Sequence, residues 1–254
     1  MNAKFNHFYS QKSGNDIKDY EDAYSPKIDG SINTSYFCCA IADGAAESSF
    51  ASDWAKMLTR SFVKEPYKDL ETLKIKSDTL GQRWRKVVQR RPLPWFAEEK
   101  VQFGAFATLL GLEISSSLNS HHSSGEWSAI AIGDSCLFQI RNSEIITAFP
   151  VATSDEFNNS PILLSSNSVK NISVWDKVLL KKGNWETGDT IFLMTDAIAN
   201  WFLSQHEQNE HPWENIIGFT ENDGTKYSFE YWINSLRSNS QIKNDDVTIL
   251  SIKF

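Results

Sequence analysis

Two aspartates in this chain stand at the ends of apolar runs of strand length. Asp43 follows the run at residues 37–42, Asp196 follows the run at residues 190–195, and a small residue comes directly after each. A buried strand holds a carboxylate rigidly at the edge of a sheet, and a small neighbour lets a ligand approach the backbone. Carboxylates presented in this way are suited to binding a hard divalent cation such as Mg²⁺ or Mn²⁺.

Other acidic residues lie where they could join the same site. Asp134 follows an apolar run, Asp245 precedes the last one, and Glu21-Asp22 lies near the N-terminus. Taken singly, Asp134 indicates a hairpin turn, Asp245 a polar strand entrance, and Glu21-Asp22 solvated charge. Asp43 by itself indicates an Asx turn. The repetition of a strand that ends in aspartate favours a metal site instead. Carboxylates that converge repel one another, so a cation must compensate their charge.

The composition limits the classes of protein to which the chain can belong. Its 254 residues are 41% hydrophobic and 22% charged, which is typical of a folded globular protein. A net charge of −7 argues against nucleic-acid binding. No apolar run approaches the roughly 20 residues that span a bilayer, and the N-terminus lacks an apolar segment of signal-peptide length. Three cysteines do not indicate a disulfide framework, so we expect a cytoplasmic protein without nucleic-acid or membrane partners.

The pattern of apolar residues predicts an α+β protein in which helices face antiparallel sheets. A hairpin turn is expected at Asn142-Ser143, and the adjacent Cys38 and Cys39 should point to opposite faces of a strand. Helices are predicted over residues 47–63, 69–90 and 197–205, and around the stripe formed by Phe229, Trp232, Ile233 and Leu236. Strands are predicted over residues 35–42, 103–114, 127–133, 135–141, 144–149, 171–180, 190–195 and 246–253. The chain has no repeat, long linker or change of composition, so we expect one domain over residues 1–254.

Six short motifs follow the order that they have in the metal-dependent protein phosphatases of type 2C. They are Glu21-Asp22-Ala23, Ala42-Asp43-Gly44, Gly104 with Ala107-Thr108, Ile132-Gly133-Asp134-Ser135, Gly188-Asp189 with Thr195-Asp196, and Asp245-Asp246-Val247-Thr248. Together they cover nearly the whole chain, and the chain resembles a divergent, bacterial-type member of this family. The resemblance implies a four-layer α-β-β-α sandwich of two antiparallel sheets flanked by helix pairs, forming a single phosphatase domain.

The resemblance also implies a reaction. Members of the family hydrolyse phosphoserine and phosphothreonine with two Mg²⁺ or Mn²⁺ ions, and by resemblance Asp43, Asp196 and Asp245 are catalytic. Asp43 would bridge both ions, while Asp196 and Asp245 would hold the first. Two cations roughly 3.5–4 Å apart turn a bridging water into a hydroxide that attacks phosphorus in line. No covalent intermediate is needed, which agrees with the lack of a serine or cysteine nucleophile signature.

The remaining acidic positions complete the implied metal site. By resemblance, Glu21 and the Gly44 carbonyl help to bind the second ion, and Asp22 orients a metal-bound water. Asp134, together with Asp196, resembles the pair that binds a third, weaker ion. The implied partner is a phosphorylated protein in a signalling circuit, either a cognate Ser/Thr kinase or the target of that kinase.

Several positions differ from the family pattern. The run Ala45-Ala46-Glu47 replaces a glycine-rich segment, and at Ala45 it lacks a histidine that serves as a general acid in eukaryotic members. Ala197 stands in place of a glycine, and Asn200 in place of an aspartate of the third metal site. A phosphate-binding arginine is absent from the N-terminal segment. Lys12 or Lys18 could replace it, but without its bidentate contact.

Three functions are compatible with these residues. The complete set of carboxylates for two ions favours an active phosphoprotein phosphatase. A pseudophosphatase would keep the fold and bind a phosphoprotein without turnover. A metal-dependent hydrolase of small phosphoesters would use the same carboxylates.

Overall fold

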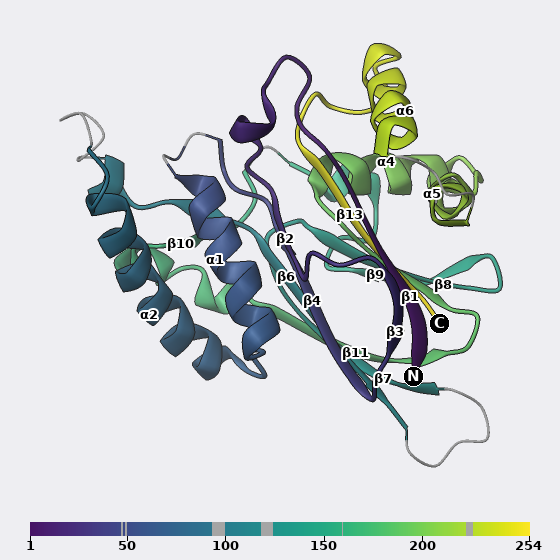
Figure 1. The fold of residues 1–254 in the computed structure, drawn as a ribbon, viewed down its shortest axis with the longest axis horizontal. Coiled ribbons are helices and arrows are strands. Elements are labelled where there is room, and N and C mark those ends of the chain that lie inside the picture. The colour runs from purple at the N-terminus through teal and green to yellow at the C-terminus, as the bar shows by residue number, and fades with distance from the viewer. Residues whose placement is uncertain (47, 49, 93–99, 118–123, 159, 222–225) are drawn as a thin grey trace.

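The computed structural model shows two β-sheets packed face to face, with helices on both outer faces (Figure 1). Helices α1 (Ala51–Lys64) and α2 (Leu70–Gln89) cover one sheet, and α4 (Asp196–Glu207), α5 (Pro212–Glu221) and α6 (Lys226–Ser238) lie on the other. The predicted four-layer sandwich is therefore confirmed. The structure describes residues 1–254 except 47, 49, 93–99, 118–123, 159 and 222–225.

The six-stranded sheet is antiparallel and joins the two ends of the chain. Its order is β3-β1-β13-β12-β8-β9. Its strands are β1 (Asn2–Ser10), β3 (Gly30–Asn33), β8 (Cys136–Arg141), β9 (Glu144–Phe149), β12 (Thr190–Met194) and β13 (Val247–Lys253). β8 and β9 form the predicted hairpin, in which Asn142 and Ser143 both have positive φ, as a two-residue turn with the twist of the strands requires. β1 is not predicted from the sequence, because its polar residues take strand form through pairing with the C-terminal β13.

The five-stranded sheet is also antiparallel, in the order β11-β7-β6-β4-β2. Its strands are β2 (Ala23–Ser25), β4 (Tyr36–Ala42), β6 (Leu109–Ser116), β7 (Ser124–Ile132) and β11 (Leu179–Glu186). A small pair, β5 (Phe106–Ala107) and β10 (Leu164–Ser165), lies apart from it. Between these elements, the described residues also include the short 3₁₀ helices η1 (Ile17–Asp19), η2 (Ser154–Glu156), η3 (Ser168–Asn171) and η4 (Trp175–Lys177).

Three clusters of buried side chains correspond to the three interfaces between the four layers. One joins α1 and α2 to the five-stranded sheet, one lies between the sheets, and one joins the six-stranded sheet to α4, α5 and α6. Cys38 belongs to the first cluster and Cys39 to the second, so the two side chains do point to opposite faces of β4. Both are free and buried, as is Cys136. Within the described part of the chain, no helix has the length and apolar character needed to span a bilayer.

Two strand predictions are wrong in part. Residues 171–178 contain the end of η3 and then η4 instead of a strand. The buried Asn171 side chain fixes this conformation, because it accepts from the Ser165 N–H at 2.8 Å and donates to the Ser165 carbonyl at 2.9 Å. β11 then runs through Gly183, where a Cβ would lie 2.4 Å from the Trp127 ring. Phe103 lies in a helical turn, so the strand predicted over 103–114 is divided between β5 and β6.

Candidate metal centre

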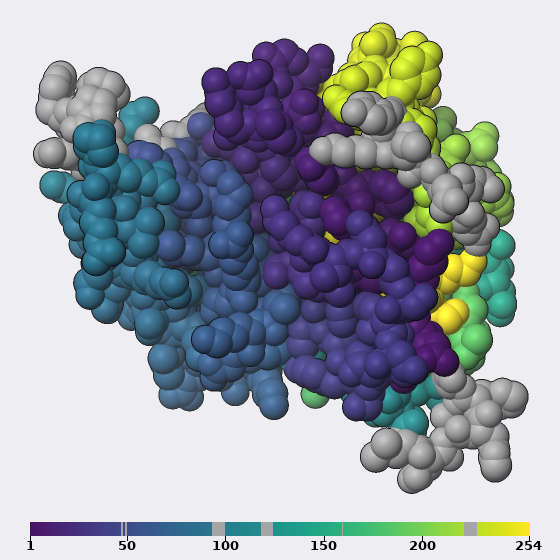
Figure 2. Space-filling view, in the orientation of Figure 1, coloured from purple at the N-terminus to yellow at the C-terminus, as the bar shows by residue number. Residues whose placement is uncertain are grey.

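The five-stranded sheet places two of the expected site residues next to each other. Ala23 of β2 pairs with Ala42 of β4, so Asp22 and Asp43 lie just beyond the paired residues. The N-terminal segment before β2 lies on the surface between α1 and α6 (Figure 2). The Asp43 N–H donates to Thr108 Oγ1 at 2.8 Å, and the Thr108 N–H donates to the Asp43 carbonyl at 2.8 Å. These two bonds fix the backbone from which the Asp43 carboxylate projects.

The six-stranded sheet brings two more acids to the same end of the sandwich. Thr195 directly follows β12, and its N–H donates to the Thr248 carbonyl of β13 at 3.1 Å. Asp196 is the first residue of α4, and Asp245 lies two residues before β13. The two aspartates therefore leave the sheet from neighbouring strands.

Asp43 interacts with all the other aspartates of the expected site. The pKa of its carboxyl is well above the ordinary value, first because it is buried and then because of the negative charges of Asp22, Asp196, Asp245 and Asp134. Such charge effects require the carboxylates to lie near one another. Asp43 therefore lies within electrostatic range of Asp22, Asp134, Asp196 and Asp245, and these five aspartates are called the acidic cluster below.

Asp22 belongs to a buried hydrogen-bond network that connects the two sheets. Its carboxylate is 1% exposed and accepts bonds from Thr195 Oγ1 at 3.0 Å and Thr248 Oγ1 at 2.7 Å. The Thr248 N–H donates to Thr195 Oγ1 at 2.9 Å, and the Tyr20 hydroxyl bonds to the Thr248 hydroxyl. Burial, followed by the charge of Asp246, raises the pKa of Asp22, while the bond from Thr248 opposes this rise. Asp22 is therefore held in one orientation.

Asp134 connects the two sheets rather than forming the hairpin turn that its sequence alone indicates. β7 and β8, on either side of it, belong to different sheets. Gly133 makes this crossing with φ of +92°, and a Cβ there would lie 2.6 Å from Thr108 Cγ2. Asp134 is 9% exposed, and in the described part of the chain its Oδ1 is a buried atom with no hydrogen-bond partner. Burial, and then the charge of Asp196, raises the pKa of Asp134 to about 7.

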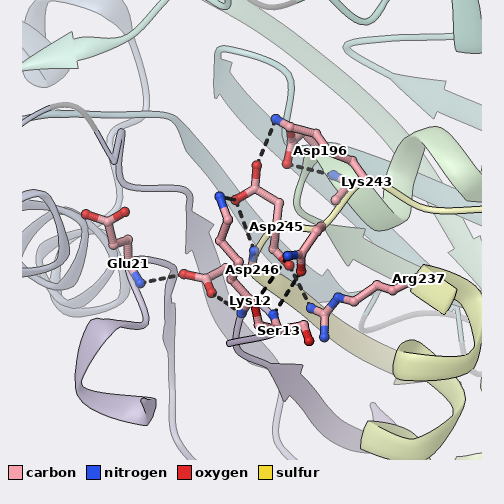
Figure 3. Close-up of polar contacts among 10 residues, drawn as sticks. Lys12, Ser13, Glu21, Asp196, Arg237, Lys243, Asp245 and Asp246 are labelled. Carbon is pink, nitrogen blue, oxygen red and sulfur yellow. Dashed lines mark hydrogen bonds and ion pairs between the residues drawn. The ribbon is translucent and has the colours of Figure 1, made fainter. Parts of the chain in front are cut away.

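A lysine lies between two of the aspartates (Figure 3). Lys243 Nζ is 2.8 Å from Asp245 Oδ2 and 3.9 Å from Asp196 Oδ2. Lys12 Nζ lies on the other side, 4.0 Å from Asp245 Oδ1. Asp196 Oδ1 also accepts from the Ala197 N–H at 2.6 Å, and burial raises the pKa of Asp196 despite the charge of Lys243. These two ammonium groups therefore only partly balance the negative charge of the five aspartates.

Asp246 fixes the backbone on the N-terminal side of the site. Its two oxygens accept from the Lys12 N–H and the Glu21 N–H, each at 2.7 Å (Figure 3). The Glu21 carboxylate points away from this contact. Burial, followed by the charges of Asp246 and Asp245, raises the pKa of Glu21 to about 7. Sequence reasoning assigned Asp246 no role, and its only signal was its position beside Asp245.

Gly44 lies against the same segment. A Cβ at this position would be 2.7 Å from the Glu21 carbonyl oxygen and 3.1 Å from Ala51 Cβ. The small residue after Asp43 therefore admits the Glu21 backbone and the first turn of α1. This contact explains the need for glycine by packing alone.

The residues expected to replace the missing arginine are in different places. Lys18 pairs with Asp16 at 3.0 Å on the surface, outside the acidic cluster. Lys12 lies beside Asp245, and sequence reasoning overlooked Lys243, because a lysine in a polar segment is usually solvated. A pocket of about 190 Å³ adjoins the cluster, with Asp196, Asn200 and Lys243 in its wall.

The donors fit a hard divalent cation in chemistry and in charge. They are carboxylate oxygens, and Asp134 Oδ1 is a buried atom without a partner, which is costly unless a cation faces it. The raised pKa values of Asp43, Asp134 and Asp196 have the same cause, namely buried negative charge without enough counter-charge. As they stand, however, no three His, Cys, Asp or Glu side chains among the described residues are grouped closely enough to hold an ion. The Lys243 ammonium lies among them instead.

Comparison with solved structures identifies the fold. The phosphatase PstP/Ppp of Mycobacterium tuberculosis has a TM-score of 0.62 and 15% identity, over 100% of this chain and 99% of that one. The catalytic domain of the serine/threonine protein phosphatase PstP in complex with two manganese ions gives 0.57 and 14%, over 99% and 98%. RsbX in complex with magnesium gives 0.52 and 16%, over 99% and 94%. These identities are low, so the likeness concerns the fold.

A comparison with curated proteins by sequence found no match. The protein phosphatase 2C family model matches residues 20–240, which include Glu21, Asp43, Asp134 and Asp196. This match spans most of the chain and agrees with the α-β-β-α sandwich and with the acidic cluster at its end. The chain belongs to the protein phosphatase 2C family.

Proposed function

We propose that this chain is a metal-dependent phosphatase of phosphoserine and phosphothreonine residues in proteins, with one catalytic domain over residues 1–254. The observation that carries the proposal is that the half-buried Asp43 and the buried Asp22 lie at the ends of paired strands, on the side from which Asp196 and Asp245 also leave the sandwich, in a chain of the protein phosphatase 2C family. The fold shared with PstP, whose catalytic domain holds two manganese ions, supports the use of two Mn²⁺ or Mg²⁺ ions.

The proposed ligands divide into two groups around Asp43. Asp196 and Asp245 would hold one ion with it, because they leave neighbouring strands and share Lys243. The carboxylate of Glu21 and the carbonyl of Gly44 would bind the other, because the two backbones are in contact. When bound, such ions supply a hydroxide nucleophile near neutral pH and neutralise charge on the phosphoryl group.

Two further aspartates have proposed roles. Asp22 would orient a metal-bound water by accepting its hydrogen bond, because Thr195 and Thr248 hold the Asp22 carboxylate in a fixed orientation. Asp134 would bind a third, weaker ion through its unpartnered Oδ1. Asn200, which replaces an acidic ligand there, donates from Nδ2 to the Ser154 carbonyl at 3.2 Å and would not add charge to that ion.

The experiment is hydrolysis of p-nitrophenyl phosphate with and without Mn²⁺. We expect turnover with Mn²⁺, none with EDTA, and a loss of at least roughly a hundredfold in Asp43→Asn and Asp196→Asn. Asp78→Asn is the control, because it also removes one negative charge but lies on the exposed face of α2, which contributes no proposed ligand. This variant should retain full activity. Activity that persists in EDTA, or in both site variants, would show that the carboxylates do not act through metal ions.

A second candidate is a pseudophosphatase that binds a phosphoprotein without turnover. The position of Lys243 among the aspartates is the observation that favours it, because an ammonium can replace a metal as counter-charge. Mn²⁺ binding by calorimetry without hydrolysis of any phosphopeptide would establish this alternative. Hydrolysis of small phosphoesters but of no phosphopeptide would instead indicate a small-molecule hydrolase.

The proposed partner is a phosphorylated protein, either a Ser/Thr kinase or its target, in a signalling circuit. The three free, buried cysteines are suited to the reducing cytoplasm, where we place this activity. A panel of phosphoserine and phosphothreonine peptides tests the substrate class, since a protein phosphatase should prefer them to p-nitrophenyl phosphate in kcat/KM.

A further inference from the structure

We propose that Lys243 is a built-in cation that occupies the acidic cluster of the metal-free protein and must be displaced when a divalent ion binds. The inference rests on the metal site proposed above and concerns how that site is controlled. Lys243 would weaken metal binding and thereby set the metal concentration at which the site fills.

The geometry places the ammonium where one of the cations would bind. Lys243 Nζ lies 2.8 Å from Asp245 Oδ2 and 3.9 Å from Asp196 Oδ2, so it contacts two carboxylates that come from different elements (Figure 3). An ordinary surface ion pair would involve one carboxylate. The pKa of Lys243 is raised by its hydrogen bond with Asp245 and, more weakly, by the charges of Asp196 and Asp43, although partial burial opposes this. One ammonium group therefore lies within ion-pair distance of two of the proposed metal ligands.

The lysine is also able to leave. Its side chain is 61% exposed, whereas those of Asp196 and Asp245 are 22% and 30% exposed. It reaches the cluster from the solvent side and lines the adjoining pocket of about 190 Å³, which offers it room outside the cluster. A divalent ion carries twice its charge and can bind several carboxylates at once, so the ion should win the competition at sufficient concentration.

The other basic groups nearby are less suited to this role. Arg237 donates from Nη2 to the Asp245 carbonyl at 2.7 Å and from Nη1 to Ser10 Oγ at 3.2 Å, and these bonds hold its guanidinium against a carbonyl and a hydroxyl instead of a carboxylate. Lys12 Nζ is 4.0 Å from Asp245, and its own backbone is bound to Asp246. Lys243 makes the shorter contact and is the one that also reaches Asp196.

The test is calorimetric titration of the metal-free protein with Mn²⁺ at constant pH and low salt. An exposed ion pair contributes up to about 1 kcal/mol, so we expect Lys243→Met to bind Mn²⁺ about three- to fivefold more tightly than the unchanged protein. Lys243→Arg keeps the positive charge and should bind Mn²⁺ within about twofold of the unchanged protein. Lys182→Met, on the exposed part of β11, is the matched control for the loss of one charge and should leave the affinity unchanged.

The outcomes separate this inference from the proposed function. Equal or weaker Mn²⁺ binding in Lys243→Met would overturn the inference while leaving the metal site in place. If that variant also had a raised KM for phosphopeptides, Lys243 would be a contact for the substrate phosphate. A failure of every variant, and of the unchanged protein, to bind Mn²⁺ would remove both the inference and the proposed site.

Discussion

Asp134→Asn should stabilise the metal-free protein at alkaline pH. The Asp134 carboxyl is 9% exposed, its Oδ1 has no partner among the described residues, and burial and Asp196 raise its pKa to about 7. In the unfolded chain, an aspartate titrates near 4. The folded state therefore holds this proton more tightly, and its contribution to stability is complete below about pH 4 and is lost as the pH rises through about 7. Asparagine carries no charge at any of these pH values.

The size of the effect follows from the difference between the two pKa values. At 1.36 kcal/mol per pH unit, the unchanged protein should lose about 2.5 kcal/mol more than Asp134→Asn between pH 5 and pH 8. Urea unfolding after removal of metal ions, followed by tryptophan fluorescence, measures this difference. Asp78→Asn, on the exposed face of α2, controls for the loss of one negative charge. If the stability of Asp134→Asn had the same pH dependence as that of the unchanged protein, the carboxyl would not be buried without a counter-charge.

Three further substitutions test the surroundings of the site. Thr195→Val removes one hydrogen bond to Asp22 and the acceptor of the Thr248 N–H, and should lower the free energy of unfolding in urea by about 2 kcal/mol. A change within the error of the measurement would contradict the hydrogen-bond network around Asp22. Gly44→Ala places a Cβ 2.7 Å from the Glu21 carbonyl oxygen. It should lower the free energy of unfolding by about 1–3 kcal/mol and weaken Mn²⁺ binding. Gly218→Ala is the control, because its Cβ would meet nothing within 4 Å, and it should have neither effect. Arg141→Met removes two 2.7 Å bonds to the buried Asp189 and should cost about 3 kcal/mol without affecting Mn²⁺ affinity; an altered affinity would show that this pair supports the site.

Several strands and helices of the fold could be predicted from the sequence because they depend on local apolar patterns, whereas the four-layer arrangement was predicted from the resemblance to the type 2C phosphatases. β4 and β12 are almost entirely apolar, β13 is rich in β-branched residues, and α2 has a clear helical stripe that ends within one residue of its predicted limits. β1 could not be predicted, because a polar segment becomes a strand here by pairing with β3 on one side and, on the other, with residues of β13 more than 200 positions away. The error at residues 171–178 has a similar cause, since the side chain of Asn171 rather than its apolar neighbours determines the local structure.

The site was predictable where an aspartate ends a strand, as at Asp43 and Asp196. Asp134 was ambiguous in isolation, because the sequence does not show that β7 and β8 lie in different sheets. Lys243 was not predictable, because its role comes from reaching two carboxylates that belong to separate elements. Such contacts depend on how the ends of the two sheets meet, which no local pattern records.

The most direct test of the metal site is anomalous scattering at the manganese edge from crystals grown with Mn²⁺. We expect two peaks that each lie roughly 2.1 Å from an oxygen of Asp43, which is the distance at which a small hard cation is coordinated. Asp196 and Asp245 should approach the same peak, and Lys243 should have moved out of the cluster. The absence of any peak beside Asp43 at saturating Mn²⁺ would contradict the proposed metal site.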